Sequence, residues 1–251
     1  MNPSSAPNHT ATDLGQRLLA GAAPTAAEAV SVTDLNLERA PIRDLRPLAG
    51  LTALRSLFLT RTPVTDLAPL AGLPHLRLLS LKLTRVADLA PLAGLASLRS
   101  LILSFTPARD LAPLAGLTGL ESLYLTGSLT RDLAPLAGLT NLTRLDLGGT
   151  AVRDLSPLAG LTRLLSLELS STPVTDLAPL AGLTSLQVLD LGDTGVSDLS
   201  PLAGLAGLRR LDLRGTKVTD LSPLAHLPQR AIVTADRFRR SRGRMQGTQP
   251  P

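Results

Sequence analysis

Residues 54–75 read LRSLFLTRTPVTDLAPLAGLPH, and units of this length and pattern follow one another without a break along most of the chain. The segment Asp-Leu-x-Pro-Leu recurs nine times at a period of 22 residues. Its aspartates are Asp44, Asp66, Asp88, Asp110, Asp132, Asp154, Asp176, Asp198 and Asp220. A fixed period of this length indicates stacked coils, each of which buries its apolar face only against its neighbours. We therefore expect one elongated domain.

The place of a residue within the unit predicts the direction of its side chain. With Leu54 as position 1, the leucines Leu57 and Leu59 fall at positions 4 and 6 and alternate with positions 3, 5 and 7. This period of two is that of a strand whose leucines point inwards and whose other side chains, such as Phe58, point outwards. Asp66, at position 13, precedes Leu-Ala-Pro, so its carboxylate can accept a backbone N–H two residues on, at the start of a short helical turn.

Two further columns of the unit are nearly constant. Threonine occupies position 9 in seven units, with Ala40 and Ser128 in the other two. Glycine occupies position 19 in eight units, where we expect a positive φ that ends the turn. These glycines are Gly50, Gly72, Gly94, Gly116, Gly138, Gly160, Gly182 and Gly204.

The leucine spacing and the 22-residue period are typical of a leucine-rich repeat. Segments such as Val174-Thr-Asp-Leu-Ala-Pro-Leu-Ala-Gly-Leu-Thr-Ser-Leu186 resemble the repeats of bacterial internalins. The resemblance implies an α/β fold. It would be a curved right-handed solenoid with a parallel sheet on the concave face, short 3-10 or helical turns on the convex face, and a protein-binding role.

Three features depart from the internalin pattern. Position 9 is threonine where the family has asparagine, the 22 residues after the array leave no room for an immunoglobulin-like segment, and no export signal or wall-sorting motif is evident. Binding of a host receptor is therefore not part of what the resemblance implies here.

The nine units fill residues 32–229 and divide the chain into three parts. Residues 1–31 are expected to hold a disordered start and a helical cap over the first coil. Thr25 and Glu28 form a capping box, which predicts a helix over residues 26–30, and a second helix is expected from Asp13 to Ala20. Residues 230–251 are expected to hold a final strand, at Ala231 to Ala235, and a basic disordered tail.

The composition excludes several kinds of site. The chain has no cysteine, so disulfides and thiolate metal sites are ruled out. Its three histidines form no ligand set, and no glycine loop for a phosphate is present, so we expect no cofactor and no metal. No segment approaches the roughly 18 apolar residues of a membrane span, and the start lacks a signal peptide. A cytoplasmic location is expected, with secretion without a Sec-type signal as the alternative.

The net charge of +5 belongs to the C-terminal tail. Residues 230–251 hold six arginines and one aspartate, so residues 1–229 carry no net charge. Five of these arginines fall between Arg237 and Arg244, where they could bind nucleic acid or an anionic surface. Charge runs are usually solvated tails, and the neutral repeats have no excess of basic groups for nucleic acid, so this is kept as one alternative function, with a secreted effector as another.

Position 5 lies at mid-strand on the predicted concave face and breaks the repeat. In chain order it reads Asn36, Phe58, Ser80, Ile102, Tyr124, Asp146, Glu168, Asp190 and Asp212. The column changes from apolar to acidic between Tyr124 and Asp146. Leu78 at position 3 and Leu83 and Phe105 at position 8 extend its apolar half.

Apolar and aromatic side chains that gather on one exposed face mark interaction sites, whereas singly scattered ones are ordinary surface. The acidic half is either a seat for a basic segment of a partner or a solvated face balanced by Arg144, Arg210 and Arg214. We predict another protein as the partner. The predicted binding residues are Phe58, Leu78, Ile102, Phe105, Tyr124, Asp146, Glu168, Asp190 and Asp212.

Catalysis by the acidic column is the least favoured hypothesis. Two carboxyl groups about 5 Å apart would suit a retaining glycosidase. Such an enzyme needs one acid held protonated in an apolar pocket, which an open strand face does not provide. We therefore expect a binding protein and no enzyme. The repeat sets a shape, so the sequence names neither the partner nor the oligomeric state.

Overall fold

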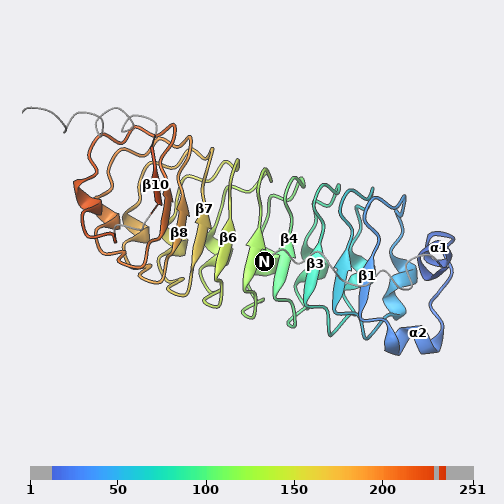
Figure 1. Ribbon diagram of the computed structural model, residues 1–251. Helices are drawn as coiled ribbons and strands as arrows, with labels where there is room; N and C mark the ends of the chain where they lie inside the picture. Colours follow the sequence, from blue (N-terminus) through green and yellow to red (C-terminus); the bar gives the residue numbers. More distant parts are fainter. Residues whose placement is uncertain (1–12, 229–231, 236–251) are drawn as a thin grey trace, which may run out of the picture.

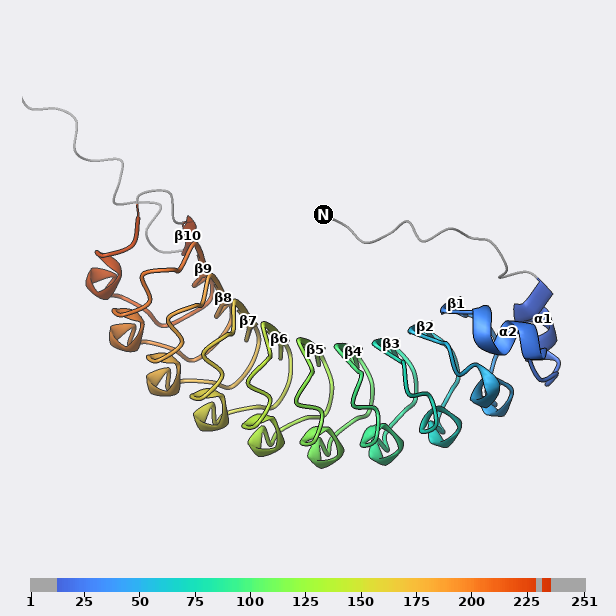
Figure 2. The ribbon, with the colours of Figure 1, turned by 90° about the horizontal axis from the view of Figure 1, so that it is seen from below.

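The computed structural model describes residues 13–228 and 232–235. These residues form a curved solenoid, with ten parallel strands in chain order along the inner side of the arc and 3-10 turns along its outer side (Figures 1 and 2). Two short helices lie at the N-terminal end. The predicted leucine-rich-repeat solenoid is confirmed.

Each strand occupies positions 3 to 5 of its unit. The strands are β1 Asp34–Asn36, β2 Ser56–Phe58, β3 Leu78–Ser80, β4 Ser100–Ile102, β5 Ser122–Tyr124, β6 Arg144–Asp146, β7 Ser166–Glu168, β8 Val188–Asp190, β9 Arg210–Asp212 and β10 Ile232–Thr234. Every strand pairs with the next at an offset of one unit, so that Ile102 lies beside Tyr124 and Tyr124 beside Asp146. Residues at one repeat position therefore stand in a column, about 4.8 Å apart.

The inward leucines form one continuous core. Leu57 and Leu59 are fully buried, and the same positions are buried in every unit from the first to the ninth. Position 9 lies beside this core, and its threonine hydroxyl donates to the carbonyl of the leucine three residues earlier, at 2.7 Å from Thr62 to Leu59. The buried hydroxyl is thus satisfied within its own coil, which explains how threonine serves at this position.

The outer side is built from one 3-10 turn per unit. The turns are η1 Arg46–Gly50, η2 Ala68–Leu70, η3 Ala90–Leu92, η4 Ala112–Leu114, η5 Ala134–Leu136, η6 Ser156–Leu158, η7 Ala178–Leu180, η8 Ser200–Leu202 and η9 Ser222–Leu224. In each unit the position-13 aspartate accepts the predicted N–H two residues on, at 2.8 Å from Ala68 N to Asp66 Oδ1. The aspartate lies one residue before the N-cap of the turn, which is Leu67 in this unit.

The prediction of positive φ at the position-19 glycines is wrong. Positive φ instead occurs at position 8 of all nine units, with φ between 56° and 70°. These residues are Arg39, Arg61, Leu83, Phe105, Gly127, Gly149, Ser171, Asp193 and Gly215. The chain leaves the sheet here while the position-8 N–H still bonds to the next coil, at 2.7 Å from Phe105 N to Thr126 O. This bond and the sharp turn together impose the left-handed backbone.

The N-terminal helices close the first coil. Helix α1 (Asp13–Leu19) buries Leu14 and Leu18, and α2 (Ala26–Ser31) begins with the predicted capping box. Thr25 N donates to Glu28 Oε2 at 2.7 Å, and Glu28 N donates to the Thr25 hydroxyl at 3.3 Å. An ion pair between Arg17 and Glu28 ties the two helices together.

Glycines at position 19 and at position 8 should respond in opposite ways to replacement by alanine. We expect Gly116→Ala to stabilise the protein by roughly 0.4–1 kcal/mol, because no atom lies within 4 Å of the added Cβ and the unfolded chain loses freedom. Gly127→Ala should destabilise it by about 1–2 kcal/mol, because φ is +63° and the new Cβ meets the Phe105 ring. Urea unfolding followed by circular dichroism measures both, and equal effects of the two variants would contradict the assignment of the turn.

Candidate functional site on the concave face

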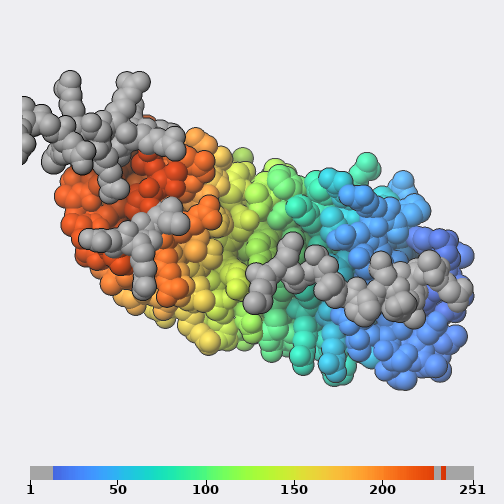
Figure 3. Space-filling view, viewed as in Figure 1, coloured from blue at the N-terminus to red at the C-terminus, as the bar shows by residue number. Residues whose placement is uncertain are grey.

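The position-5 column runs along the middle of the concave sheet. The pairing of the strands places Phe58, Ser80, Ile102 and Tyr124 side by side, followed by the acidic residues. Figure 3 looks onto this side of the molecule, where the units follow one another as bands from blue to red. The predicted arrangement of the column in space is thus confirmed, whereas a binding role for its residues stays a prediction.

The apolar half of the column is half-buried. Phe58, Ile102 and Tyr124 each keep part of their surface in the concavity, as does Leu78 at position 3 of the third unit. Ser80 interrupts the series because it is buried, and its hydroxyl lies 3.0 Å from the hydroxyl of Thr60.

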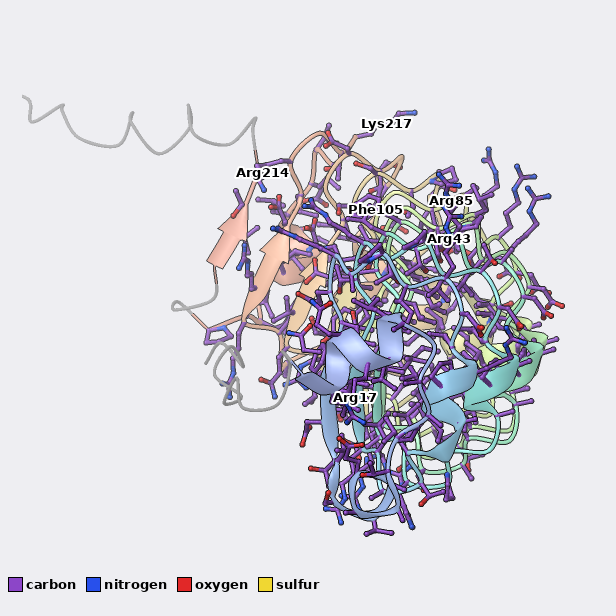
Figure 4. All side chains as sticks on the ribbon, turned by 90° about the vertical axis from the view of Figure 1, so that its right-hand side faces the viewer. Arg17, Arg43, Arg85, Phe105, Arg214 and Lys217 are labelled. Carbon is purple, nitrogen blue, oxygen red and sulfur yellow. The ribbon has the colours of Figure 1, made fainter. Side chains whose placement is uncertain are left out.

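The position-8 residues form the rim of the apolar half. Phe105 is 50% exposed and Leu83 is 38% exposed. In Figure 4, Phe105 lies on the same edge of the coils as Arg43 and Arg85. A shallow hollow of about 380 Å³ opens between this rim and the sheet, and we call it the N-terminal hollow. It is lined by Glu38, Arg39, Phe58, Thr60, Arg61, Ser80, Lys82, Leu83 and Ile102.

The aspartates of the column have a structural role that the sequence analysis missed. Asp146 Oδ1 accepts the N–H of Gly148 at 3.0 Å, and Asp190 Oδ1 accepts that of Gly192 at 2.8 Å. Asn36 makes the same bond in the first unit. Short polar side chains commonly bond to the backbone two residues on, so the recurrence of Asp and Asn at this position was the available signal.

Asp212 is not available to a partner, contrary to the sequence-based expectation. It is only 5% exposed, and the Arg214 guanidinium donates to both of its carboxylate oxygens, at 3.0 and 2.9 Å from Nε. The hydrogen bond from the Arg214 side chain, with further help from the Arg214 backbone, lowers the pKa of Asp212. The proposed offset of charge by Arg214 is therefore realised, and it closes this end of the acidic half.

The pKa of Glu168 is shifted in the opposite direction to that of Asp212. Its burial, together with the charges of Asp190 and Asp146 on the neighbouring strands, raises its pKa, and Arg210 offsets only part of this. The strand pattern of the sequence predicts no such environment on an open face. The hollow beside it, about 270 Å³, is lined by Tyr124, Thr126, Arg144, Leu145, Asp146, Ser166, Glu168 and Ser170.

Two kinds of site are absent from the part of the chain that the structure describes. No group of three or more His, Cys, Asp or Glu residues that could hold a metal ion occurs there. No helix among the same residues is long and apolar enough to cross a membrane.

Comparisons with known proteins agree with this architecture. A family model described as Leucine Rich repeats (2 copies) matches residues 140–182, 162–204 and 184–226. Internalin C2 of Listeria monocytogenes is 32% identical, with a TM-score of 0.67, and the match covers 88% of this chain and 90% of that one. A comparison with curated protein sequences gives no match.

Two further solved structures share the fold over part of their length. An internalin (inlF) of Listeria monocytogenes is 33% identical, with a TM-score of 0.74, over 78% of this chain and 58% of that chain. This chain thus spans less than two thirds of that protein. A leucine-rich-repeat protein of Leptospira interrogans is 22% identical, with a TM-score of 0.76, over 82% of this chain and 54% of that one.

Neutralising Glu168 should stabilise the protein above mildly acidic pH. Its raised pKa means that folding favours the protonated form, so this contribution is present below the unfolded pKa of about 4.3 and is lost as pH rises through the folded pKa. We expect Glu168→Gln to raise the urea midpoint at pH 7 and to leave it unchanged below about pH 4.

Glu121→Gln provides the control for this measurement. Glu121 is exposed, and its carboxylate lies 3.9 Å from Nε of Arg99, so its neutralisation should bring no stabilisation. A lower urea midpoint for Glu168→Gln at pH 7 would show that the ionised carboxylate is favourable in the fold.

Proposed function

This chain belongs to the bacterial leucine-rich-repeat proteins with internalin-like repeats, and from this we propose that it is a protein-binding scaffold whose partner lies across the concave face. One observation carries the proposal. A single column of the sheet, held in register by the strand pairing, presents Phe58, Ile102 and Tyr124 and then three partly open acids. The packing of the core leucines does not require large apolar groups on the concave face of these strands.

The apolar half supplies the binding energy in this proposal. Aromatic side chains dominate the energetic centres of protein interfaces, and Phe58 and Tyr124 are two of the four aromatic residues of the chain. Because both are already half-buried, they lose little conformational freedom when a partner covers them.

The acidic half supplies specificity for a basic segment. Asp146, Glu168 and Asp190 lie on adjacent strands, and they remain partly exposed. Clustered carboxylates attract a basic partner and disfavour acidic ones. The burial of Glu168 between two like charges raises its pKa, and a cationic group of the partner would relieve that repulsion.

A non-enzymatic role fits the column better than catalysis does. Burial raises the pKa of Glu168, but Asp146 and Asp190 each accept a backbone N–H two residues further on. The hollow beside Glu168 is shallow and open, so it would not exclude water from a reacting bond. The alternative role of the arginine-rich tail falls outside the described residues and stays a prediction.

Loss of the apolar anchors should abolish binding. We expect the full chain to capture a partner from an extract of the producing cells, and the double variant Phe58→Ala with Tyr124→Ala to lose it, since truncated aromatic anchors typically cost about 2 kcal/mol or more each. Arg131→Ala with Arg153→Ala, two exposed residues at position 12, is the matched control. Equal capture by all three proteins would exclude the concave face.

Neutralisation of the acidic half tests the basic segment. Glu168→Gln with Asp190→Asn removes two charges and leaves an acceptor for the N–H of Gly192. Partner binding should weaken by about tenfold, and wild-type binding should become weaker with added salt, because exposed charges are screened. Binding of the captured partner is measured by calorimetry, and an unchanged affinity would remove the electrostatic half of the proposal.

A further inference from the structure

The inner units of the concave face divide into a basic and an acidic group, which the neutral total of the repeats conceals. Positions 2 to 8 of the second, third and fourth units carry five basic side chains and no acidic one. These are Arg55, Arg61, Arg77, Lys82 and Arg99, all of them exposed. The same positions of the sixth, seventh and eighth units carry four acids, Asp146, Glu168, Asp190 and Asp193, and one basic residue, Arg144.

The N-terminal hollow lies within the basic half and has an apolar floor. Phe58 and Ile102 line it from the sheet and Leu83 from the rim, while Arg61 and Lys82 stand around it. Neither Arg61 nor Lys82 forms an ion pair within the described part of the chain. The hollow therefore offers an apolar floor whose charged border holds three basic residues, Arg39, Arg61 and Lys82, and one acid, Glu38.

Leu83 lines this hollow, and Phe105 holds the same position in the next coil. Leu83 and Phe105 are both at φ 58°, a left-handed backbone that bulky side chains rarely adopt, and both are exposed to water. Every unit has this backbone at position 8, but of the nine residues there only Leu83 and Phe105 are large and apolar. Strain and exposed apolar surface at one place indicate a functional constraint.

We propose that the N-terminal hollow and its rim, Leu83 and Phe105, bind an acidic segment of the partner that carries a bulky apolar side chain. The inference rests on the concave face being the binding surface. Charge complementarity selects the occupant, because carboxylates would lie beside Arg61 and Lys82 while the apolar group covers Phe58 and Ile102.

The two halves together define the charge pattern of the partner. The third and seventh units are four strands apart, or about 19 Å at about 4.8 Å per strand. An extended chain covers this distance in about six residues. A partner segment therefore matches the whole face in one orientation if one end carries acidic and apolar residues and the other end, at that spacing, carries basic residues.

A displayed library of random peptides, selected on the immobilised full chain, tests this proposal. Enriched sequences should combine Asp or Glu with a large apolar residue, and their synthetic peptides should bind in fluorescence anisotropy. Arg61→Glu with Lys82→Glu should weaken that binding by about tenfold or more, whereas Arg131→Glu with Arg153→Glu should leave it unchanged. Enriched peptides without acidic residues, or an unchanged affinity of the first variant, would overturn the proposal.

The rim is tested by replacing its two residues with glycine. Leu83→Gly with Phe105→Gly should weaken peptide binding by about tenfold, while the thermal unfolding midpoint stays the same or rises because glycine accepts the left-handed backbone. Unchanged binding would overturn the role of the rim. If peptide affinity falls on substitution of Tyr124 but not of Arg61 and Lys82, this inference is overturned and the scaffold function stands. If no variant of the concave face changes peptide affinity, both are overturned.

Discussion

Every feature of this protein depends on one constraint: no coil can bury its own leucines. Leu57 and Leu59 are shielded only because the coils before and after press against them, and the same holds along the array. Burial in this geometry requires identical register between neighbours, and the one-unit offset of the strand pairs is the result. The 22-residue period of the sequence thus follows from the packing of each coil against the next.

The same constraint frees the outward positions to vary. Since the strand pairing fixes where each side chain stands, side chains of different size and charge can occupy positions 3, 5 and 7 in different units of the same stack. The chain uses this freedom unevenly. Its apolar side chains and the basic groups of the second to fourth units lie toward the N-terminal end of the concave face. The acids of the sixth to eighth units lie toward the C-terminal end, where Arg214 covers Asp212.

At a few of these positions the backbone conformation or the charge of the side chain is locally unfavourable. Leu83 and Phe105 adopt a backbone that suits glycine, and Glu168 lies between two aspartates that raise its pKa. The left-handed backbone at position 8 is common to all nine units, but a large apolar side chain occupies it only in these two. Both features lie on the face that we propose as the binding surface.

The sequence by itself determined the solenoid, the strand phase, the capping box at Thr25 and the backbone N–H bond that each position-13 aspartate accepts. These features follow from periodicity and local hydrogen bonding. Tertiary structure alone decided the position of the left-handed turn, the burial of Asp212 and the hollow between Phe58 and Leu83. These depend on where one coil lies against the next and on how a neighbouring side chain covers or opens a surface. No spacing within a single unit specifies such contacts.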